Sequence, residues 1–272
     1  MPSPTQITVS QLFRLIGTPK APHIIDVCID DDFNMDPRLI PSAVRCSYSS
    51  CETLVTQLKS KHVVIICQKG LKLSQGVAAL LRTHGIYAES LEGGNFAWRD
   101  KGFPLIPVSK LPPLEKGQTT LWVTKQRPKV DKIACAWLIR RFVDPEARFL
   151  FTSASEVINV SEKFSGVPFD VENTFWGHRG EQCTFDTMLS ELDLETDALL
   201  RLAKVVRGAD TDRLDLSPQS AGLLAASLGL SRLHSNDLDQ LEAGLTLYDA
   251  FYLWSRDAKN ETHKHIPIEN NK

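Results

Sequence analysis

The residue with the clearest chemical potential is Cys67, which follows the apolar run 63–66 and precedes a basic loop that contains a glycine. A cysteine thiolate is a nucleophile, and neighbouring cations or a helix N-terminus lower its pKa. Gly70 would let the backbone approach a ligand closely, and Lys69 and Lys72 add positive charge. These residues alone fit two structures about equally: a nucleophile held over an anion cradle, or a small buried thiol at the end of a strand.

The first of these interpretations predicts that the loop binds a persulfide, thiosulfate or another tetrahedral oxyanion. Backbone N–H groups of such a loop converge on the anion, and the dipole of the helix that follows adds to the attraction. The candidate anion-binding residues are the six that follow Cys67: Gln68, Lys69, Gly70, Leu71, Lys72 and Leu73.

A second group of chemically capable residues lies in the stretches WGHRGEQC and RGADTDRLD. His178 combined with Asp210, and with Glu172 or Asp131, would offer nitrogen and oxygen ligands to a divalent metal ion. None of these spacings is an established metal signature. The alternative is that Asp210 and Asp212 cap helices and that His178 is a hydrogen-bonded loop residue.

Arginines near this group allow a further interpretation. Arg140, Arg141, Arg207 and Arg213 could attract an oxyanion, although arginines in helical stretches more often form a solvated face. Arg179 and Arg207 are also expected to pair with carboxylates.

Alternating strand and helix patterns must position Cys67 across about residues 5–107. The expected strands are 23–27, 43–45, 63–66 and 86–91, and the expected helices are 10–16, capped by Ser10, 51–59, 74–84 and a short one after Gly93-Gly94. Such alternation indicates a parallel sheet with helices on both faces. Ligands of these folds bind beyond the carboxyl ends of the strands, where Cys67 lies.

A different pattern follows the proline-rich stretch 104–118. We place an N-terminal domain at 1–106, a linker at 107–118, a mainly helical α+β domain at 119–262 and a polar tail at 263–272. The second domain has expected strands at 121–123, 148–152 and 167–171. Its expected helices are 131–142, 197–207, ending at Gly208, 217–229 and 236–254.

Composition restricts the classes of protein that fit. Of 272 residues, 42% are hydrophobic and 24% charged, which is typical of a soluble globular protein with a real core. The net charge of −2 gives no electrostatic basis for a nucleic-acid or membrane partner. No run approaches the roughly 18 to 20 apolar residues of a membrane span, and no secretory signal is visible. The six cysteines are scattered through a long chain without secretory features, which favours free thiols in the cytoplasm. The lack of a Cys-x-x-Cys pair argues against a zinc ribbon or a thioredoxin-type site.

Four motifs in the N-terminal domain occur together in a familiar order: IIDV at 24–27, LIPSA at 39–43, CQKG at 67–70 and LEGGNFAW at 91–98. With these, about residues 7–105 resemble the rhodanese-like sulfurtransferases. The resemblance implies that Cys67 is the sulfur-carrying cysteine and that the backbone of 67–73 forms its cradle. The chain departs from the family at Cys28, where many members have arginine, and at Lys72, which is nearest in register to the usual arginine of the loop. The loop is also about one residue longer, as in members that act on bulkier oxyanions.

Longer blocks mark the second domain, among them VDKIACAWLIRRFVDPEARFLF at 130–151 and VVRGADTDRLDLSPQSAGLLAASLGLSRL at 205–233. These blocks resemble the C-terminal domain of bacterial chromate-resistance proteins. The resemblance implies a role in tolerance to chromate, and members of the family have been linked to chromate sensing and transcriptional control. It implies no particular catalytic residues.

Taken together, these features predict a rhodanese-type sulfurtransferase or oxyanion-handling protein. Sulfur would pass from a small oxyanion or other sulfur donor to Cys67 as a persulfide and then to an acceptor thiol, with no required cofactor. A divalent metal ion in the C-terminal domain, through His178 and Asp210, is a further possibility. The alternative prediction is a non-catalytic chromate or redox sensor.

Overall fold

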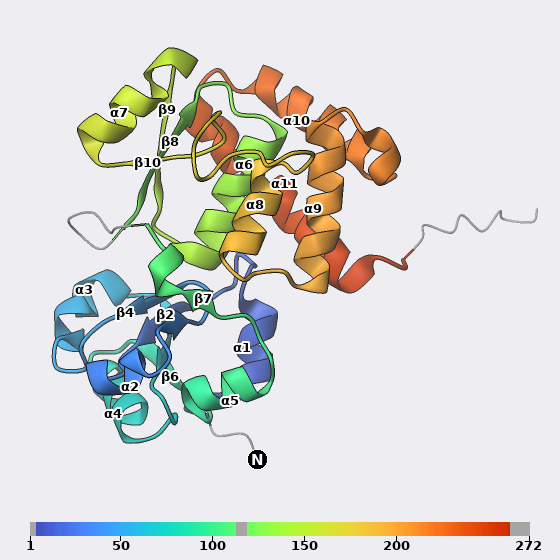
Figure 1. The fold of residues 1–272 in the computed structure, drawn as a ribbon. Helices are drawn as coiled ribbons and strands as arrows, with labels where there is room; N and C mark the ends of the chain where they lie inside the picture. The colour runs from blue at the N-terminus through green and yellow to red at the C-terminus, as the bar shows by residue number, and fades with distance from the viewer. Residues whose placement is uncertain (1–3, 113–118, 262–272) are drawn as a thin grey trace, which may run out of the picture.

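The computed structural model describes residues 4–112 and 119–261. Figure 1 shows an N-terminal α/β half, coloured from blue to green, below a C-terminal half in which helices predominate. Half of the predicted linker (113–118) and all of the predicted tail 263–272 lie outside the described residues, and the predicted domain boundaries stay a prediction. None of the helices in the described ranges is long and apolar enough to cross a membrane.

The N-terminal half is built on a five-stranded sheet in the order β1-β6-β5-β2-β4, in which every pair of neighbours is parallel. The strands are β1 (Gln6–Ile7), β2 (His23–Asp26), β4 (Ala43–Arg45), β5 (His62–Ile66) and β6 (Tyr87–Leu91). Residues 63–66 of the central strand β5 are fully buried, as a strand covered on both faces requires. The parallel sheet predicted from the sequence is confirmed.

Helices connect these parallel strands. They are α1 (Val9–Leu15), α2 (Asp30–Asn34), α3 (Val55–Leu58), α4 (Lys72–Thr83) and α5 (Gly94–Asp100). The strand order runs one way as far as β4 and then reverses, so right-handed crossovers place α1 on one face and α3 and α4 on the other. A small antiparallel pair, β3 (Arg38–Leu39) with β7 (Ile106–Pro107), closes this half.

Some predicted helix ends are wrong. Thr8, not Ser10, caps α1, because its side chain accepts from the backbone of Gln11 while the Gln11 side chain accepts from the backbone of Thr8. The predicted helix 51–59 is a 3₁₀ turn (Cys51–Leu54) followed by α3. The helix after Cys67 begins at Lys72, two residues earlier than predicted, so Lys72 and Leu73 belong to its first turn.

The C-terminal half combines a parallel three-stranded sheet with a group of helices. The sheet has the order β10 (Val167–Pro168), β8 (Leu121–Lys125), β9 (Arg148–Thr152). The helices are α6 (Val130–Leu138), α7 (Val157–Phe164), α8 (Thr184–Glu191), α9 (Asp197–Asp210), α10 (Ser220–Leu233) and α11 (Asp237–Leu253). Short 3₁₀ turns lie at Ala154–Glu156 and Leu214–Leu216, and π-helical turns extend α6 (Ile139–Val143) and α11 (Trp254–Ala258). A further 3₁₀ turn, Val108–Lys110, directly follows β7 of the other half. Helix α6 lies at the centre: it packs against α8, α9 and α11, and all of its residues except Lys132 are buried.

Three predictions for this half fail in ways that bear on the site. Helix α9 continues past Gly208 to Asp210, so Gly208 is no cap. It is a contact point instead, since a Cβ there would lie 2.4 Å from the Ser220 hydroxyl oxygen of α10. Helix α10 spans 220–233 instead of 217–229. The predicted strand 167–171 pairs with β8 only over β10, and the chain then turns at Asp170, where φ is +52°.

The two halves pack directly against each other. The backbone N–H of Ser42 donates to the carbonyl of Phe142 across the junction at 2.6 Å. Gly17 is needed there, because a Cβ would meet the ring of Phe142 at 2.4 Å. Lys61 also pairs with Glu146 at 3.2 Å. Buried apolar residues of both halves therefore form one continuous cluster.

Candidate functional site

Cys67 lies where the sequence places it, directly after the central strand β5. Its side chain is almost buried, with 5% of the residue exposed. The Cys67 Sγ–H donates to the Oγ of Ser74 at 3.1 Å, and the Ser74 hydroxyl donates to the carbonyl of Leu71 at 3.2 Å. Since Ser74 belongs to the first turn of α4, the thiol is held at the N-terminal end of a twelve-residue helix.

Several backbone N–H groups in the loop between β5 and α4 have no acceptor among the described residues. Within residues 4–112 and 119–261, the N–H groups of Gln68, Lys69 and Leu71 donate to no protein acceptor. The N–H of Gly70 makes only a long bond of 3.4 Å to the carbonyl of Cys67. The side chains of Lys69 and Lys72 are exposed. A loop with unpaired N–H groups and two cations next to a thiol is suited to binding an anion.

Two glycines, Gly94 of the LEGG motif and Gly70 of the loop itself, allow the close contacts that hold this loop in place. The backbone N–H groups of Asn95 and Phe96 donate to the carbonyls of Cys67 and Gln68, each at 3.1 Å. Gly94 has φ of +59°, and a Cβ on it would lie 2.1 Å from the Cys67 carbonyl oxygen. Gly70 has φ of +67°, and its Cβ would lie 2.4 Å from the Leu91 carbonyl oxygen. The motif after β6 therefore positions the motif after β5 through backbone contacts that only glycine permits.

All six cysteines are free, and burial raises the pKa of four of them. Burial, and then the charge of Asp26, raises the pKa of Cys28, whose Sγ accepts a hydrogen bond from Asn95 Nδ2 at 3.4 Å. Burial likewise raises the pKa of Cys51 to about 12 and those of Cys135 and Cys183 well above the usual value. These four cysteines remain neutral thiols at neutral pH, so none of them is a competing nucleophile.

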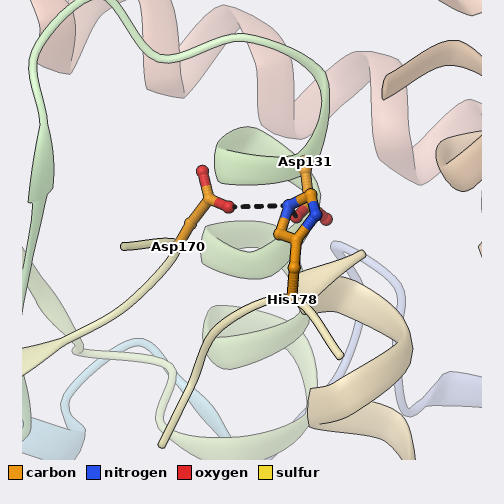
Figure 2. A group of neighbouring side chains, drawn as sticks. All are labelled: Asp131, Asp170 and His178. Carbon is orange, nitrogen blue, oxygen red and sulfur yellow. Dashed lines mark ion pairs between the residues drawn. The ribbon is translucent and has the colours of Figure 1, made fainter. Parts of the chain in front are cut away.

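The second group of candidates forms a compact cluster in the C-terminal half, which we call the His178 cluster: Asp131, Asp170, His178 and Asp210. His178 Nε2 lies 3.3 Å from Asp131 Oδ2, 3.2 Å from Asp170 Oδ1 and 3.6 Å from Asp210 Oδ2. Figure 2 shows the Asp131, Asp170 and His178 side chains pointing toward one another. The four residues come from four places: the first turn of α6, the turn after β10, the loop before α8 and the last residue of α9.

Backbone and side-chain donors fix the carboxylates of this cluster. Asp131 is 1% exposed and accepts from the N–H groups of Thr184 at 2.8 Å and Phe185 at 3.0 Å, so it caps the N-terminus of α8. The hydroxyl of Thr184 donates to Asp170 Oδ1 at 2.9 Å, and Lys132 pairs with Asp170 Oδ2. The oxygens that face His178 are therefore held in place from behind.

The crowding of acidic groups changes their proton affinities. Hydrogen bonds to Asp131 and Asp170 raise the pKa of His178 to about 10. Burial opposes the ionisation of Asp170, but hydrogen bonding from His178 and the charge of Lys132 outweigh it and lower its pKa to about 2. Burial, and then repulsion by Asp131 and Asp170, raises the pKa of Asp210 to about 6. The negative charge of the three carboxylates thus exceeds the positive charge that Lys132 and a protonated His178 supply.

The structure brings together some of the residues named from sequence and separates others. His178, Asp210 and Asp131 meet, whereas Glu172 is exposed and lies outside the cluster. Asp170 was missed; its position at the end of a strand beside β8 was the available signal.

The alternative roles considered for these residues are only partly correct. Asp210 and Asp212 cap no helix: Asp210 ends α9, Asp212 has φ of +56°, and the residue before α10 is Gln219. The arginines do pair with carboxylates. The pairs are Arg179 with Glu191, Arg207 with Asp186, Arg213 with Asp215, Arg140 with Glu242 and Arg141 with Asp249. These pairs leave no arginine group assembled for an oxyanion in the described part of this domain.

Comparison with known proteins supports the resemblance of the C-terminal domain. Residues 122–255 match the family described as ChrB, C-terminal domain. Protein ChrB of Cupriavidus metallidurans is 33% identical over 133 residues, which are 48% of this chain and 39% of ChrB. The chain therefore matches about two fifths of the length of this curated relative. The predicted resemblance of the C-terminal domain is confirmed.

Rhodanese-like proteins are among the solved structures that are similar to part of this chain. A rhodanese-related protein of Thermoplasma volcanium is 22% identical, with a TM-score of 0.32, and the match covers 37% of this chain and 96% of that one. A rhodanese-like domain protein of Staphylococcus aureus is 28% identical, with a TM-score of 0.31, covering 35% of this chain and 90% of that one. The parallel α/β fold of this half rests on its own strand order.

Proposed function

We propose that the chain is a rhodanese-like thiol enzyme of the chromate-resistance proteins, in which Cys67 accepts a sulfur atom. The observation that carries this proposal is the thiol of Cys67 beside the unpaired N–H groups of Gln68, Lys69 and Leu71. A thiolate at this position would attack the outer sulfur of a donor such as thiosulfate. The sulfur–sulfur bond of the donor breaks, sulfite leaves with the electron pair, and Cys67 becomes a persulfide.

In the second half of the reaction, an acceptor thiolate attacks the outer sulfur of the persulfide and Cys67 leaves as a thiolate. The loop N–H groups and the helix α4 dipole would stabilise the anionic donor and the persulfide. This transfer requires no resident cofactor. It does require reduced cysteines, which the six free thiols and a cytoplasmic location would satisfy.

The role in chromate tolerance is part of the same proposal. It is supported by the ChrB match of residues 122–255, and chromate is itself a tetrahedral oxyanion dianion that such a loop would suit. The sensor alternative differs in one respect: Cys67 would bind or react with the oxyanion once without turning over.

Sulfur loading of Cys67 tests the proposal. Wild-type protein incubated with thiosulfate should gain the mass of one sulfur atom and should transfer it to cyanide or a thiol. Cys67→Ser should lose both the mass gain and the turnover, because a hydroxyl is no substitute for a thiolate nucleophile. Cys46→Ser is the matched control, since Cys46 is a partly exposed cysteine of the same half and should leave the reaction unchanged.

The outcomes separate the alternatives. A wild-type protein that never carries the sulfur and shows no turnover overturns the transfer activity. A Cys67-dependent modification by chromate in a protein without turnover would identify the sensor instead.

A further inference from the structure

We propose that the His178 cluster binds one divalent transition-metal ion, with Asp131, Asp170 and His178 as its ligands and the Asp210 carboxylate beside them. This site lies in the other half of the molecule from Cys67, and the sulfur chemistry proposed above uses none of its residues. Its ligands are one imidazole nitrogen and two carboxylate oxygens.

The spacing of the candidate ligand atoms matches a coordination shell. Metal–nitrogen and metal–oxygen bonds of zinc are about 2.0–2.2 Å, so the corners of a tetrahedron around such an ion lie about 3.3–3.6 Å apart. The ligand atoms of Asp131, Asp170 and His178 lie within 4.8 Å of one another, and His178 Nε2 lies 3.3 Å from Asp131 and 3.2 Å from Asp170. Asp210 lies 3.6 Å from His178 Nε2, at the edge of this group. A single ring nitrogen carries at most one hydrogen, which cannot point at three carboxylates at once. One ion between Asp131, Asp170 and His178 would contact all three of them.

Charge balance points the same way. The three carboxylates carry three negative charges, and Lys132, which pairs with Asp170, supplies one positive charge. With a neutral His178 as a ligand, two negative charges remain, and a divalent ion neutralises both. Without an ion, a proton on His178 would still leave one negative charge next to the buried Asp131 and Asp170 carboxylates, which is costly.

The ligands are also held in position before any ion arrives. The Thr184 and Phe185 N–H groups hold Asp131, while the Thr184 hydroxyl and Lys132 hold Asp170. Such supporting hydrogen bonds orient metal ligands and strengthen binding. The His178 side chain is 45% exposed, so an ion could enter from solvent on that side.

The donor set restricts the choice of metal. Imidazole favours zinc, iron and related ions, and carboxylates also suit manganese. Thiolate-seeking ions such as Cu(I) are disfavoured, because both nearby cysteines are buried thiols with raised pKa values. Cys135 Sγ contacts Asp131 Oδ1 at 3.7 Å, and Cys183 Sγ donates to Asp186 at 3.2 Å. We therefore expect Mn²⁺ or Zn²⁺ to be the most informative probes.

Direct metal binding tests the proposal. Untagged full-length protein is stripped with EDTA and titrated with Mn²⁺, with free Mn²⁺ read from its electron paramagnetic resonance signal and bound Zn²⁺ read by elemental analysis. We expect one strong site per chain. His178→Ala should weaken binding at least about tenfold, because even the loss of a supporting group outside the ligand shell costs that much.

The matched control is Glu172→Gln. It removes a carboxylate charge from the same loop, two residues from Asp170, but removes no ligand, so it should bind metal like the wild type. His263 and His265 in the C-terminal sequence stay intact in every variant, so metal bound there cannot imitate an effect of His178.

Two results would overturn the site: wild-type protein that binds neither Mn²⁺ nor Zn²⁺, or a folded His178→Ala variant that binds as tightly as the wild type. The titration of the wild-type protein still tests the site if the His178→Ala variant does not fold. Cys67→Ser should leave metal binding unchanged, so failure of the metal site and failure of sulfur transfer are distinguishable.

Discussion

The Cys67 loop and the His178 cluster differ in the kind of group that each presents to a ligand. The loop presents backbone N–H groups, a thiol and two exposed lysines, and all of these groups belong to one contiguous segment. Only the contacts that support the loop come from another segment, around Gly94. The cluster presents three carboxylates and one imidazole, which four separate segments deliver. One is built for an anion and the other for a cation.

The difference also concerns what holds each site together. The loop depends on backbone contacts with Gly94 and Asn95, so its shape is fixed by sterics. The cluster depends on burial and charge, and Asp131 and Asp170 repel Asp210. We therefore expect steric substitutions to break the first site and charge substitutions to change the second.

The largest effect is expected for Gly94→Ala. The new Cβ would lie 2.1 Å from the Cys67 carbonyl oxygen at a positive φ. Overpacking together with backbone strain should cost about 3 kcal/mol of unfolding free energy. Urea unfolding measures this loss, and the displaced loop should also lose sulfur loading at Cys67.

Gly85→Ala is the matched control for Gly94→Ala. Gly85 has φ of +76°, but a Cβ there meets nothing within 4 Å. It should cost only about 1 kcal/mol, the strain of the left-handed conformation, and should leave sulfur loading intact. Equal losses for the two variants would show that the contact with Cys67 does not matter.

Asp210→Asn should produce a smaller effect, and one of opposite sign, in the metal-free protein. Burial, and then repulsion by Asp131 and Asp170, raises the pKa of Asp210 from 3.8 to about 6. The folded protein therefore holds this proton more tightly than the unfolded chain. The resulting stabilisation is present below about pH 4 and is lost as the pH rises through about 6.

Asparagine carries no charge to repel, so the variant should melt a few degrees higher than wild type at pH 7 in EDTA. Its advantage should shrink as the pH falls toward 4. The same substitution should weaken Mn²⁺ binding, because it removes a negative charge beside the ion. If Asp210→Asn melted at a lower temperature than the wild type at pH 7, burial and carboxylate repulsion would not be the cause of the raised pKa of Asp210.

The contrast between the sites also explains what sequence could predict. The Cys67 loop follows an apolar strand and leads into a helix, so local patterns of β5 and α4 were sufficient to find it. The order IIDV, CQKG, LEGG then identified the domain. Sequence could not show that Gly94 contacts the Cys67 carbonyl, because that contact joins two strand ends in space.

The His178 cluster was only half predicted for the same physical reason. His178 and Asp210 were chosen by residue type, but no local pattern relates Asp170 to either of them. Asp170 enters the cluster because β10 pairs with β8 and the chain then turns in a left-handed conformation. The sequence predicts that this helix ends at Gly208, because glycine often follows the last residue of a helix. In the structure α9 continues to Asp210, and the missing side chain of Gly208 makes room for Ser220 of the neighbouring helix α10.

The smallest effect is expected for Lys72→Arg, which probes the anion preference of the loop. Lys72 is exposed at the start of α4 and is nearest in register to the arginine that rhodanese-like sequences usually carry. A guanidinium donates two parallel hydrogen bonds to an oxyanion, whereas an ammonium acts as a point charge. If Cys67 turns over thiosulfate, Lys72→Arg should lower KM about threefold to tenfold and change kcat less. Lys59→Arg, an exposed change outside the loop, should leave both constants unaltered. An unchanged KM in Lys72→Arg would mean that the side chain at this position does not contact the anion, and the backbone N–H groups would then carry the binding alone.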